Sequence, residues 1–279
     1  MERQILAFIK LTVNSFAKWI RFIISRRRVE DCSGSPLLTA NIEHTSIGHE
    51  RIYCIGDSHV GFFSGQDHIQ PNWPNRSDDL LPYFKTFRLG AILAYSLLDY
   101  GSTYKGRELL SVLLDRGIPA PERQIPPKST LLLCFGEIDC RAHLLKQAKI
   151  QNRSISSVVI DCVERYGSVI SEVVDLGYKV LVWNVIPSTR YEISDGDFPT
   201  IGTCIERNQI SRLFNNHLET LCATSGAKLI SIFDDLVDEQ GLTKMEYYSD
   251  RVHLSQKAMG LALAKIREVT ESSHITHEV

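Results

Sequence analysis

Short apolar runs are spaced along this chain, and the segments between them repeat their apolar residues at helical intervals. The runs are almost continuously apolar rather than alternating, which is typical of strands buried on both faces of a parallel sheet. Strands of this kind that alternate with amphipathic helices predict an α/β fold, with helices covering both faces of the sheet. The predicted strands are 51–55, 85–88, 130–135, 179–185 and 228–233.

Three longer helices are predicted from spacing and capping signals. Apolar residues recur every three or four positions over 154–176. Thr203 followed by Glu206 is a capping-box pattern, which predicts that a helix begins there and covers about 203–223. A last helix is expected over about 255–270.

Composition sets the class of protein. The chain has 279 residues, of which 43% are apolar, and this is enough for one large domain, which we assign to 51–270. The formal net charge of -2 gives no field that would attract nucleic acid. Seven cysteines are scattered without a CxxC pair, which favours reduced thiols in a cytoplasmic protein.

Residues 1–28 form a separate apolar and basic segment. Basic residues such as Lys10 and Arg21 interrupt it, so no run reaches the roughly 20 residues needed to cross a bilayer. The spacing predicts a basic amphipathic helix, which suits either peripheral binding to an anionic membrane surface or packing on a protein. We assign 29–50 to a linker and 271–279 to a tail.

Polar residues gather directly after the predicted strands. In open parallel sheets, sites form beyond the carboxyl ends of the strands. The motifs GDSH, RLG, GEIDCR and IPSTR follow the first four strands, and the fifth leads through a loop to YYSDRVHLS. We therefore expect the functional site at this edge of the sheet.

Three of these residues could form a nucleophilic site. A serine hydroxyl such as that of Ser58 needs a base within hydrogen-bond reach. Histidine is the usual base, and a carboxylate fixes its tautomer and stabilises the imidazolium. Asp250 and His253 lie three residues apart, so one tight turn could present both side chains to Ser58.

These motifs resemble the SGNH, or GDSL, hydrolase family. GDS at 56–58 is followed far downstream by DxxH at 250–253, and Gly90, expected to open a helix, is similar to the glycine of the family's second block. The segment 181–188 is similar to its fourth strand and the turn after it. The resemblance spans about residues 51–270. It implies a flavodoxin-like three-layer α/β/α sandwich with about five parallel strands.

The resemblance also implies an activity and residue roles. Ser58 would be the nucleophile, His253 the general base and Asp250 its orienting carboxylate, with the N–H groups of Ser58 and Gly90 as oxyanion donors. The expected function is that of a serine esterase with an acyl-ester or carbohydrate substrate and no cofactor, and glycan-linked O-acyl groups are one candidate substrate. An O-acyltransferase of glycan biosynthesis would use the same triad.

The third block departs from the family pattern. The family has Gly-x-Asn-Asp there, and the asparagine side chain supplies a third oxyanion donor. This sequence has GEID at 136–139, and Ile138 cannot donate a hydrogen bond. Either the two main-chain donors suffice, or another group replaces that donor; the candidates are Arg141, His143 and Asn184.

The same block contains other polar residues that we assign to the oxyanion and substrate region, namely Glu137, Asp139 and Arg141. One hypothesis is a variant site adapted to an anionic substrate that Arg141 meets. The alternative is that the two carboxylates are loop residues paired with Arg141.

Two further interpretations stay open. Gly-Asp-x-His also opens the calcineurin-like metallophosphatases, but their other metal-binding segments are missing here, so we expect no metal and expect His59 to line the site. A chain of this fold could instead bind a glycan or a partner without turnover. The loops 64–84 and 186–202 are expected to roof the site, and their aromatic residues suit sugars; they are Trp73, Tyr83 and Tyr191.

Overall fold

The structure is a computed structural model, and it describes residues 51–114, 124–194 and 197–271. The helix expected over 1–28, the linker 29–50 and the tail from residue 272 lie outside the described residues and stay predictions. The described residues all belong to one compact unit of the chain, Ser46–Val279.

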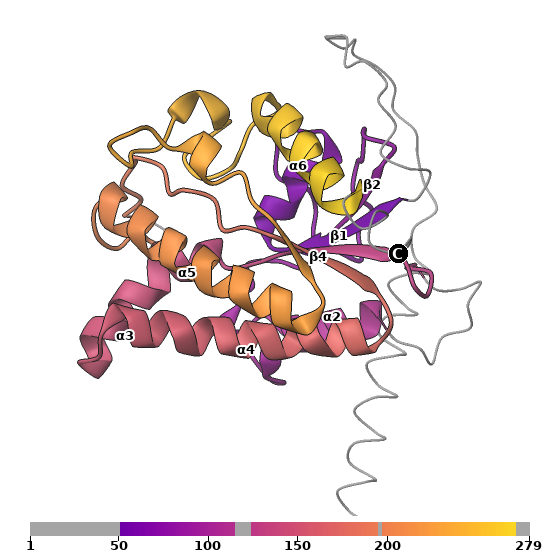
Figure 1. Cartoon of the computed structure of the whole chain (residues 1–279), viewed down its shortest axis with the longest axis horizontal. Helices are drawn as coiled ribbons and strands as arrows, with labels where there is room; N and C mark the ends of the chain where they lie inside the picture. Colours follow the sequence, from indigo (N-terminus) through magenta and orange to yellow (C-terminus); the bar gives the residue numbers. More distant parts are fainter. Residues whose placement is uncertain (1–50, 115–123, 195–196, 272–279) are drawn as a thin grey trace, which may run out of the picture. The chain divides into compact units, whose positions relative to one another are not determined.

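A sheet of five parallel strands forms the centre of this unit, as Figure 1 shows. The strand order is β2-β1-β3-β4-β5, which is the flavodoxin-like order, and it confirms the expected α/β fold. The strands are β1 (Ile52–Gly56), β2 (Phe84–Arg88), β3 (Thr130–Cys134), β4 (Lys179–Trp183) and β5 (Lys228–Ile230).

Helices cover both faces of the sheet. On β3, Leu131 and Leu133 belong to one apolar core, and Leu132 and Cys134 belong to the other, because successive side chains of a strand point to opposite faces. The first core is covered by α2 (Gly106–Leu113), α3 (Leu144–Gln151), α4 (Ile155–Asp175) and α5 (Cys204–Ser225). The second is covered by the 3-10 helix η1 (Ser58–Ser64) and by α6 (Met259–Glu271), which lies opposite α4 and α5 in Figure 1.

The last two strands end earlier than the apolar runs suggest. Asn184 follows β4 directly, and its side chain forms hydrogen bonds with main-chain groups at this point. Its Oδ1 accepts from the N–H of Ile232 at 3.1 Å, and its Nδ2 donates to the carbonyl of Val185 at 2.9 Å. These side-chain bonds take the place of ladder bonds, so the sheet ends while the chain is still apolar.

The predicted helix starts are confirmed. Ser154 caps α4, and Thr203 with Glu206 forms the predicted capping box at the start of α5. The last helix begins as a 3-10 turn capped by Ser255 and continues as α6.

The prediction that a helix opens at Gly90 is wrong. Gly90 has φ +113°, which lies outside helical backbone, and the chain continues as a loop into the 3-10 helix η2 (Tyr95–Leu98). Asp139 accepts from the N–H groups of Ala94 and Tyr95, so this loop is tied to the end of β3 rather than to a helix of its own.

Within the three described stretches, no helix has both the length and the apolar composition that a membrane span requires.

Candidate active site

Ser58 lies directly beyond the carboxyl end of β1, at the start of η1. The residues before it explain this position. Gly56 must be glycine because a Cβ there would lie 2.3 Å from the carbonyl oxygen of Cys134 on the neighbouring strand. Asp57 then caps η1, and its Oδ1 accepts from the N–H of His59 at 2.8 Å. The Asp57 side chain therefore holds the turn that presents Ser58.

The structure brings Ser58, His253 and Asp250 into one hydrogen-bonded chain. The distance from His253 Nε2 to Ser58 Oγ is 2.8 Å, and that from His253 Nδ1 to Asp250 Oδ2 is also 2.8 Å. A carboxylate can only accept, so Nδ1 carries the proton and Nε2 is left to accept from the Ser58 hydroxyl. This is the arrangement in which an imidazole can take a proton from a serine.

The electrostatics of this pair suit a neutral base. Burial lowers the pKa of His253, and it outweighs the raising effect of the hydrogen bond to Asp250. Burial alone would raise the pKa of Asp250, but hydrogen bonds from the His253 side chain and from the N–H groups of His253 and Val252 hold it well below its usual range. Asp250 is therefore ionised, and His253 is largely neutral near pH 7.

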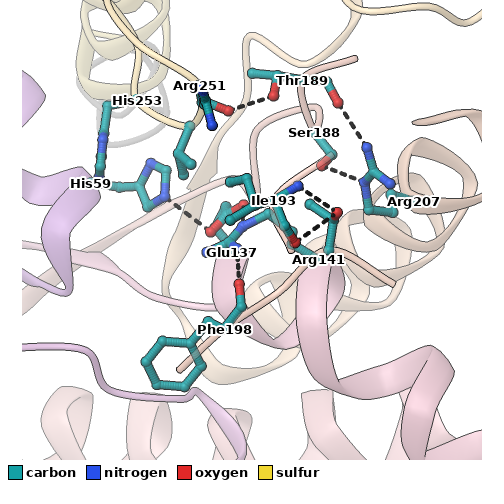
Figure 2. A network of polar contacts seen from close by, with 12 residues as sticks. His59, Glu137, Arg141, Ser188, Thr189, Ile193, Phe198, Arg207, Arg251 and His253 are labelled. Carbon is teal, nitrogen blue, oxygen red and sulfur yellow. Dashed lines mark hydrogen bonds and ion pairs between the residues drawn. The ribbon is translucent and has the colours of Figure 1, made fainter. Parts of the chain in front are cut away.

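A buried arginine positions the loop that carries this pair, as Figure 2 shows. Arg207 is 1% exposed; its Nε donates to Ser188 Oγ and one Nη to the carbonyl of Thr189, both at 2.8 Å. The Thr189 hydroxyl in turn donates to the carbonyl of Arg251, between Asp250 and His253. Sequence reasoning missed Arg207, because nothing in its helical surroundings indicates burial.

Gly90 lies two residues beyond the end of β2, where Arg88 is paired with Gly56 of β1. The N–H of Leu89 donates to the carbonyl of Gly56 at 2.8 Å, which fixes the two strand ends side by side. Within the described residues, neither the N–H of Ser58 nor that of Gly90 donates to another protein group. The side-chain amide of Asn72 lies against Gly90, since a Cβ built on this glycine would be 3.7 Å from Asn72 Nδ2. Sequence reasoning also missed Asn72.

The third block contributes no donor at Ile138, which is buried and 3% exposed. Asp139 is buried too, and it accepts from the N–H of Ala94 at 2.8 Å and of Tyr95 at 3.1 Å. Burial raises the pKa of Asp139 to about 7. Asp139 thus supports the loop that follows Gly90.

Glu137 lies between two basic side chains (Figure 2). Its Oε1 accepts from Arg141 Nε at 2.7 Å, and its Oε2 is 3.1 Å from His59 Nε2. Burial would raise the pKa of Glu137, but Arg141 and His59 lower it to about 2. Arg141 also donates to the carbonyl of Phe198 at 2.5 Å. The charge of Arg141 is thus matched by Glu137 rather than open to an anionic substrate.

The other two candidates for the missing donor are engaged elsewhere. Both ends of the Asn184 amide are used at the end of the sheet. The His143 ring packs edge-on against Phe198, with centroids 5.7 Å apart, beside a different hollow of the surface.

A hollow opens beside Ser58 and His253. Its apolar lining comes from Phe62, Trp183, Ile186 and Leu254, and its rim includes residues 66–69. One end of the loop 64–84 and the start of the loop 186–202 therefore border the site, as predicted. Their aromatic residues do not line the hollow: Trp73 Nε1 donates to Gln124, Tyr83 packs on the core and Tyr191 is 52% exposed.

The metallophosphatase alternative gains no support from the site. Asp57 Oδ1 accepts from the main-chain N–H of His59, and the His59 ring faces Glu137. In the ranges the structure describes, no group of three or more His, Cys, Asp or Glu residues could hold a metal ion.

No protein-family model matches the sequence, and no curated protein matches it. A GDSL-like lipase from Bacteroides thetaiotaomicron is similar in structure, with 14% identity, a TM-score of 0.46 and coverage of 80% of this chain and 89% of that one. A phospholipase A1 from Streptomyces albidoflavus is 13% identical, with a TM-score of 0.42 and coverage of 79% and 99%. The OSK domain of Drosophila Oskar is 10% identical, with a TM-score of 0.44 and coverage of 77% and 86%.

The fold itself can be compared with the expectation from the sequence. The strand order, the helices on both faces and the strand ends that carry Ser58, Gly90 and GEID are those that the resemblance implies. The described part of this chain has the flavodoxin-like α/β fold that the resemblance implies.

Proposed function

We propose that this protein is a serine esterase that cleaves acyl esters through an acyl-enzyme intermediate on Ser58. The observation that carries the proposal is the hydrogen-bonded chain from Asp250 through His253 to Ser58, with both links at 2.8 Å. These residues reach each other across 195 positions of the sequence, so their meeting is a product of the fold.

The first step is acylation. Ser58 Oγ attacks the ester carbonyl while its proton passes to His253 Nε2. Asp250 stabilises the resulting imidazolium, which then gives the proton to the oxygen of the departing alcohol. The ester C–O bond breaks, and the acyl group remains bound to Ser58. In the second step, water attacks the acyl group while His253 Nε2 accepts a proton from it. His253 then returns this proton to Ser58 Oγ as the bond between Ser58 and the acyl group breaks, which releases the acid and restores the enzyme.

The negative charge on the carbonyl oxygen needs donors. The N–H groups of Ser58 and Gly90 lack protein partners within the described residues, which supports a role as oxyanion donors. For the third donor we propose Asn72, because its side-chain amide lies against Gly90. This amide would take the place of the family's asparagine, which is Ile138 in this chain.

The hollow beside Ser58 favours an ester substrate with a small acyl group. Phe62, Trp183, Ile186 and Leu254 line it next to the nucleophile, but each is 5% exposed or less, so the open hydrocarbon surface is small. A glycan-linked ester is a narrower proposal. Tyr191 on the loop 186–202 is 52% exposed, so its ring is accessible to a sugar.

An activity-based fluorophosphonate probe tests the proposal. We expect it to label the wild-type protein, and we expect the label to disappear in Ser58→Ala and in His253→Ala, because the hydroxyl needs its base. Ser168→Ala removes an exposed serine of α4 and is the matched control, which should label like the wild type. A folded wild-type protein that is not labelled would favour a protein that binds without turnover.

Hydrolysis and acyl transfer share the acyl-enzyme on Ser58 and differ in the group that attacks it. Incubation with an acyl-nitrophenol, with and without sugar acceptors, separates them. We expect release of the free acid at a rate that the sugars leave unchanged. Formation of acyl-sugar faster than hydrolysis would assign the protein as an O-acyltransferase instead.

A further inference from the structure

The residues that distinguish this site from the family pattern contact one another. His59 follows the nucleophile, and Glu137 and Arg141 belong to the altered third block. Figure 2 shows them in one row, with Glu137 between His59 and Arg141. The three side chains are buried, with residue exposures of 6%, 6% and 8%. A buried carboxylate with a basic partner on each oxygen is a specific electrostatic arrangement rather than a solvated surface pair.

This arrangement favours a charged His59. Arg141 is bound to one oxygen of Glu137 and to the carbonyl of Phe198, so the carboxylate is held with its other oxygen facing the His59 ring. Burial would lower the pKa of His59, but Glu137 outweighs it and raises the pKa. Asp57 adds to the raising effect and Arg141 opposes it. His59 is therefore an imidazolium under conditions in which a free histidine is largely neutral.

The charge on His59 lies next to the base of the triad. The centroids of the His59 and His253 rings are 4.8 Å apart, with 38° between the ring planes. Two carboxylates act on His253 in the opposite sense, Asp250 through its hydrogen bond and Glu137 from behind His59. Asp67 and His68 from the loop after η1 line the same hollow. Among the main contributions from described residues, the charge of His59 disfavours a proton on His253, and the two carboxylates favour one.

We propose that His59, held as an imidazolium by Glu137, which Arg141 fixes in place, is a positioning residue that keeps His253 unprotonated in the free enzyme and so extends the activity of the triad to lower pH. The inference rests on the proposed esterase function for its effect on rate, although the interaction between the two rings does not. It also gives the altered third block a role. Glu137 stabilises the charge on His59, which acts on the base His253, whereas the family's third block supplies an oxyanion donor.

The decisive variant is His59→Gln. The glutamine amide can face Glu137 Oε2 as a neutral donor, but it carries no charge, so His253 binds its proton more tightly. We expect the acidic limb of the kcat/KM profile to move up by about one pH unit, with little loss at the alkaline plateau. Glu137→Gln should move the limb in the same direction but by less, because His59 then loses the partner that holds its proton while His253 also loses the raising effect of Glu137 on its pKa. His217→Gln on α5 is the matched control and should leave the profile unchanged.

A purely structural role predicts a different result. It would lower the plateau of His59→Gln and leave the acidic limb at the wild-type pH, and that outcome would overturn the inference. Thermal unfolding of each variant shows whether Glu137→Gln, which leaves Arg141 unpaired, still folds. If it does not, His59→Gln alone decides.

The titration of His253 can be followed without any activity. The ring resonances of His253, observed by NMR in histidine-labelled protein, give its protonation midpoint directly. We expect the midpoint to rise by about one pH unit in His59→Gln. A risen midpoint in a protein that turns over no ester would refute the esterase and keep the inference. An unchanged midpoint in an active enzyme would refute the inference alone.

Discussion

The proposed role of Asn72 as an oxyanion donor rests on the position of its side-chain amide beside Gly90. An asparagine amide is a neutral donor that gains most when the carbonyl oxygen becomes negatively charged. Removing such a donor should therefore affect the transition state more than the bound substrate.

We expect Asn72→Ala to lower kcat by about a hundredfold with little change in KM. Steady-state kinetics on an acyl-nitrophenol measure both constants. Asn75→Ala, on the same loop, is the matched control and should keep both. If kcat of Asn72→Ala equals that of the wild type, the two main-chain N–H groups of Ser58 and Gly90 suffice.

The order of chemical motifs made part of this site predictable. Ser58 follows a strand, and Asp250 and His253 share one turn, so three residues could be placed together from the sequence. Asn72 could not, because it belongs to a long loop without periodicity, and only the folded path of that loop brings it to Gly90. The Glu137–His59 pair follows adjacent strands, but nothing in the sequence indicates which partner Glu137 selects.

Among the secondary-structure elements, the strands and long helices were predictable because their apolar periodicity extends over several turns. The failure came at Gly90, where a backbone with φ +113° and the two N–H bonds to Asp139 replace the expected helix. These bonds link positions about 45 residues apart, and local sequence patterns do not contain that information.

The packing of α4 against α5 gives a sharp prediction about helix elements. Gly167 on α4 allows close approach, since a Cβ there would lie 2.0 Å from Cδ1 of Leu221 on α5. We expect Gly167→Ala to lower the free energy of unfolding by about 1–2 kcal/mol, because the clash outweighs the better helix propensity of alanine. Urea unfolding measures this difference.

Two further variants test whether the clash with Leu221 causes this loss of stability. Gly260→Ala on α6 meets no atom within 4 Å, so the same substitution should be neutral or stabilising there. Gly167→Ala combined with Leu221→Ala should lower the free energy of unfolding by less than the sum of the two single variants. The reason is that the shortened side chain at position 221 leaves room for the new Cβ at position 167. Strict additivity would show that α4 and α5 do not meet at Gly167.

In the molecule as a whole, the site gathers buried ionisable groups, and these couple folding to pH. Burial raises the pKa of Asp139 to about 7 and that of Asp57 to about 6. Glu137 raises the pKa of His59. Each of these groups binds its proton more tightly in the folded state than in the unfolded chain. Their contribution to stability is therefore present at low pH and is lost as pH rises through the folded-state pKa.

Glu137 behaves in the opposite way. Its folded pKa of about 2 lies below the value of an unfolded chain, so its contribution is complete above about pH 5 and changes little at higher pH. Between pH 5 and pH 8, the loss from Asp57, Asp139 and His59 should dominate. We therefore expect the protein to be more stable at pH 5 than at pH 8, as measured by urea unfolding at the two pH values.

Asp139→Asn isolates the largest part of this effect. The asparagine oxygen can still accept an N–H from the loop after Gly90, but it cannot ionise. Its stability should fall less between pH 5 and pH 8 than that of the wild type, by on the order of 2 kcal/mol. Asp175→Asn, which changes an exposed carboxylate at the end of α4, should parallel the wild type. If Asp139→Asn loses as much stability as the wild type, Asp139 is already ionised at pH 5, and the N–H groups of Ala94 and Tyr95 compensate for its burial.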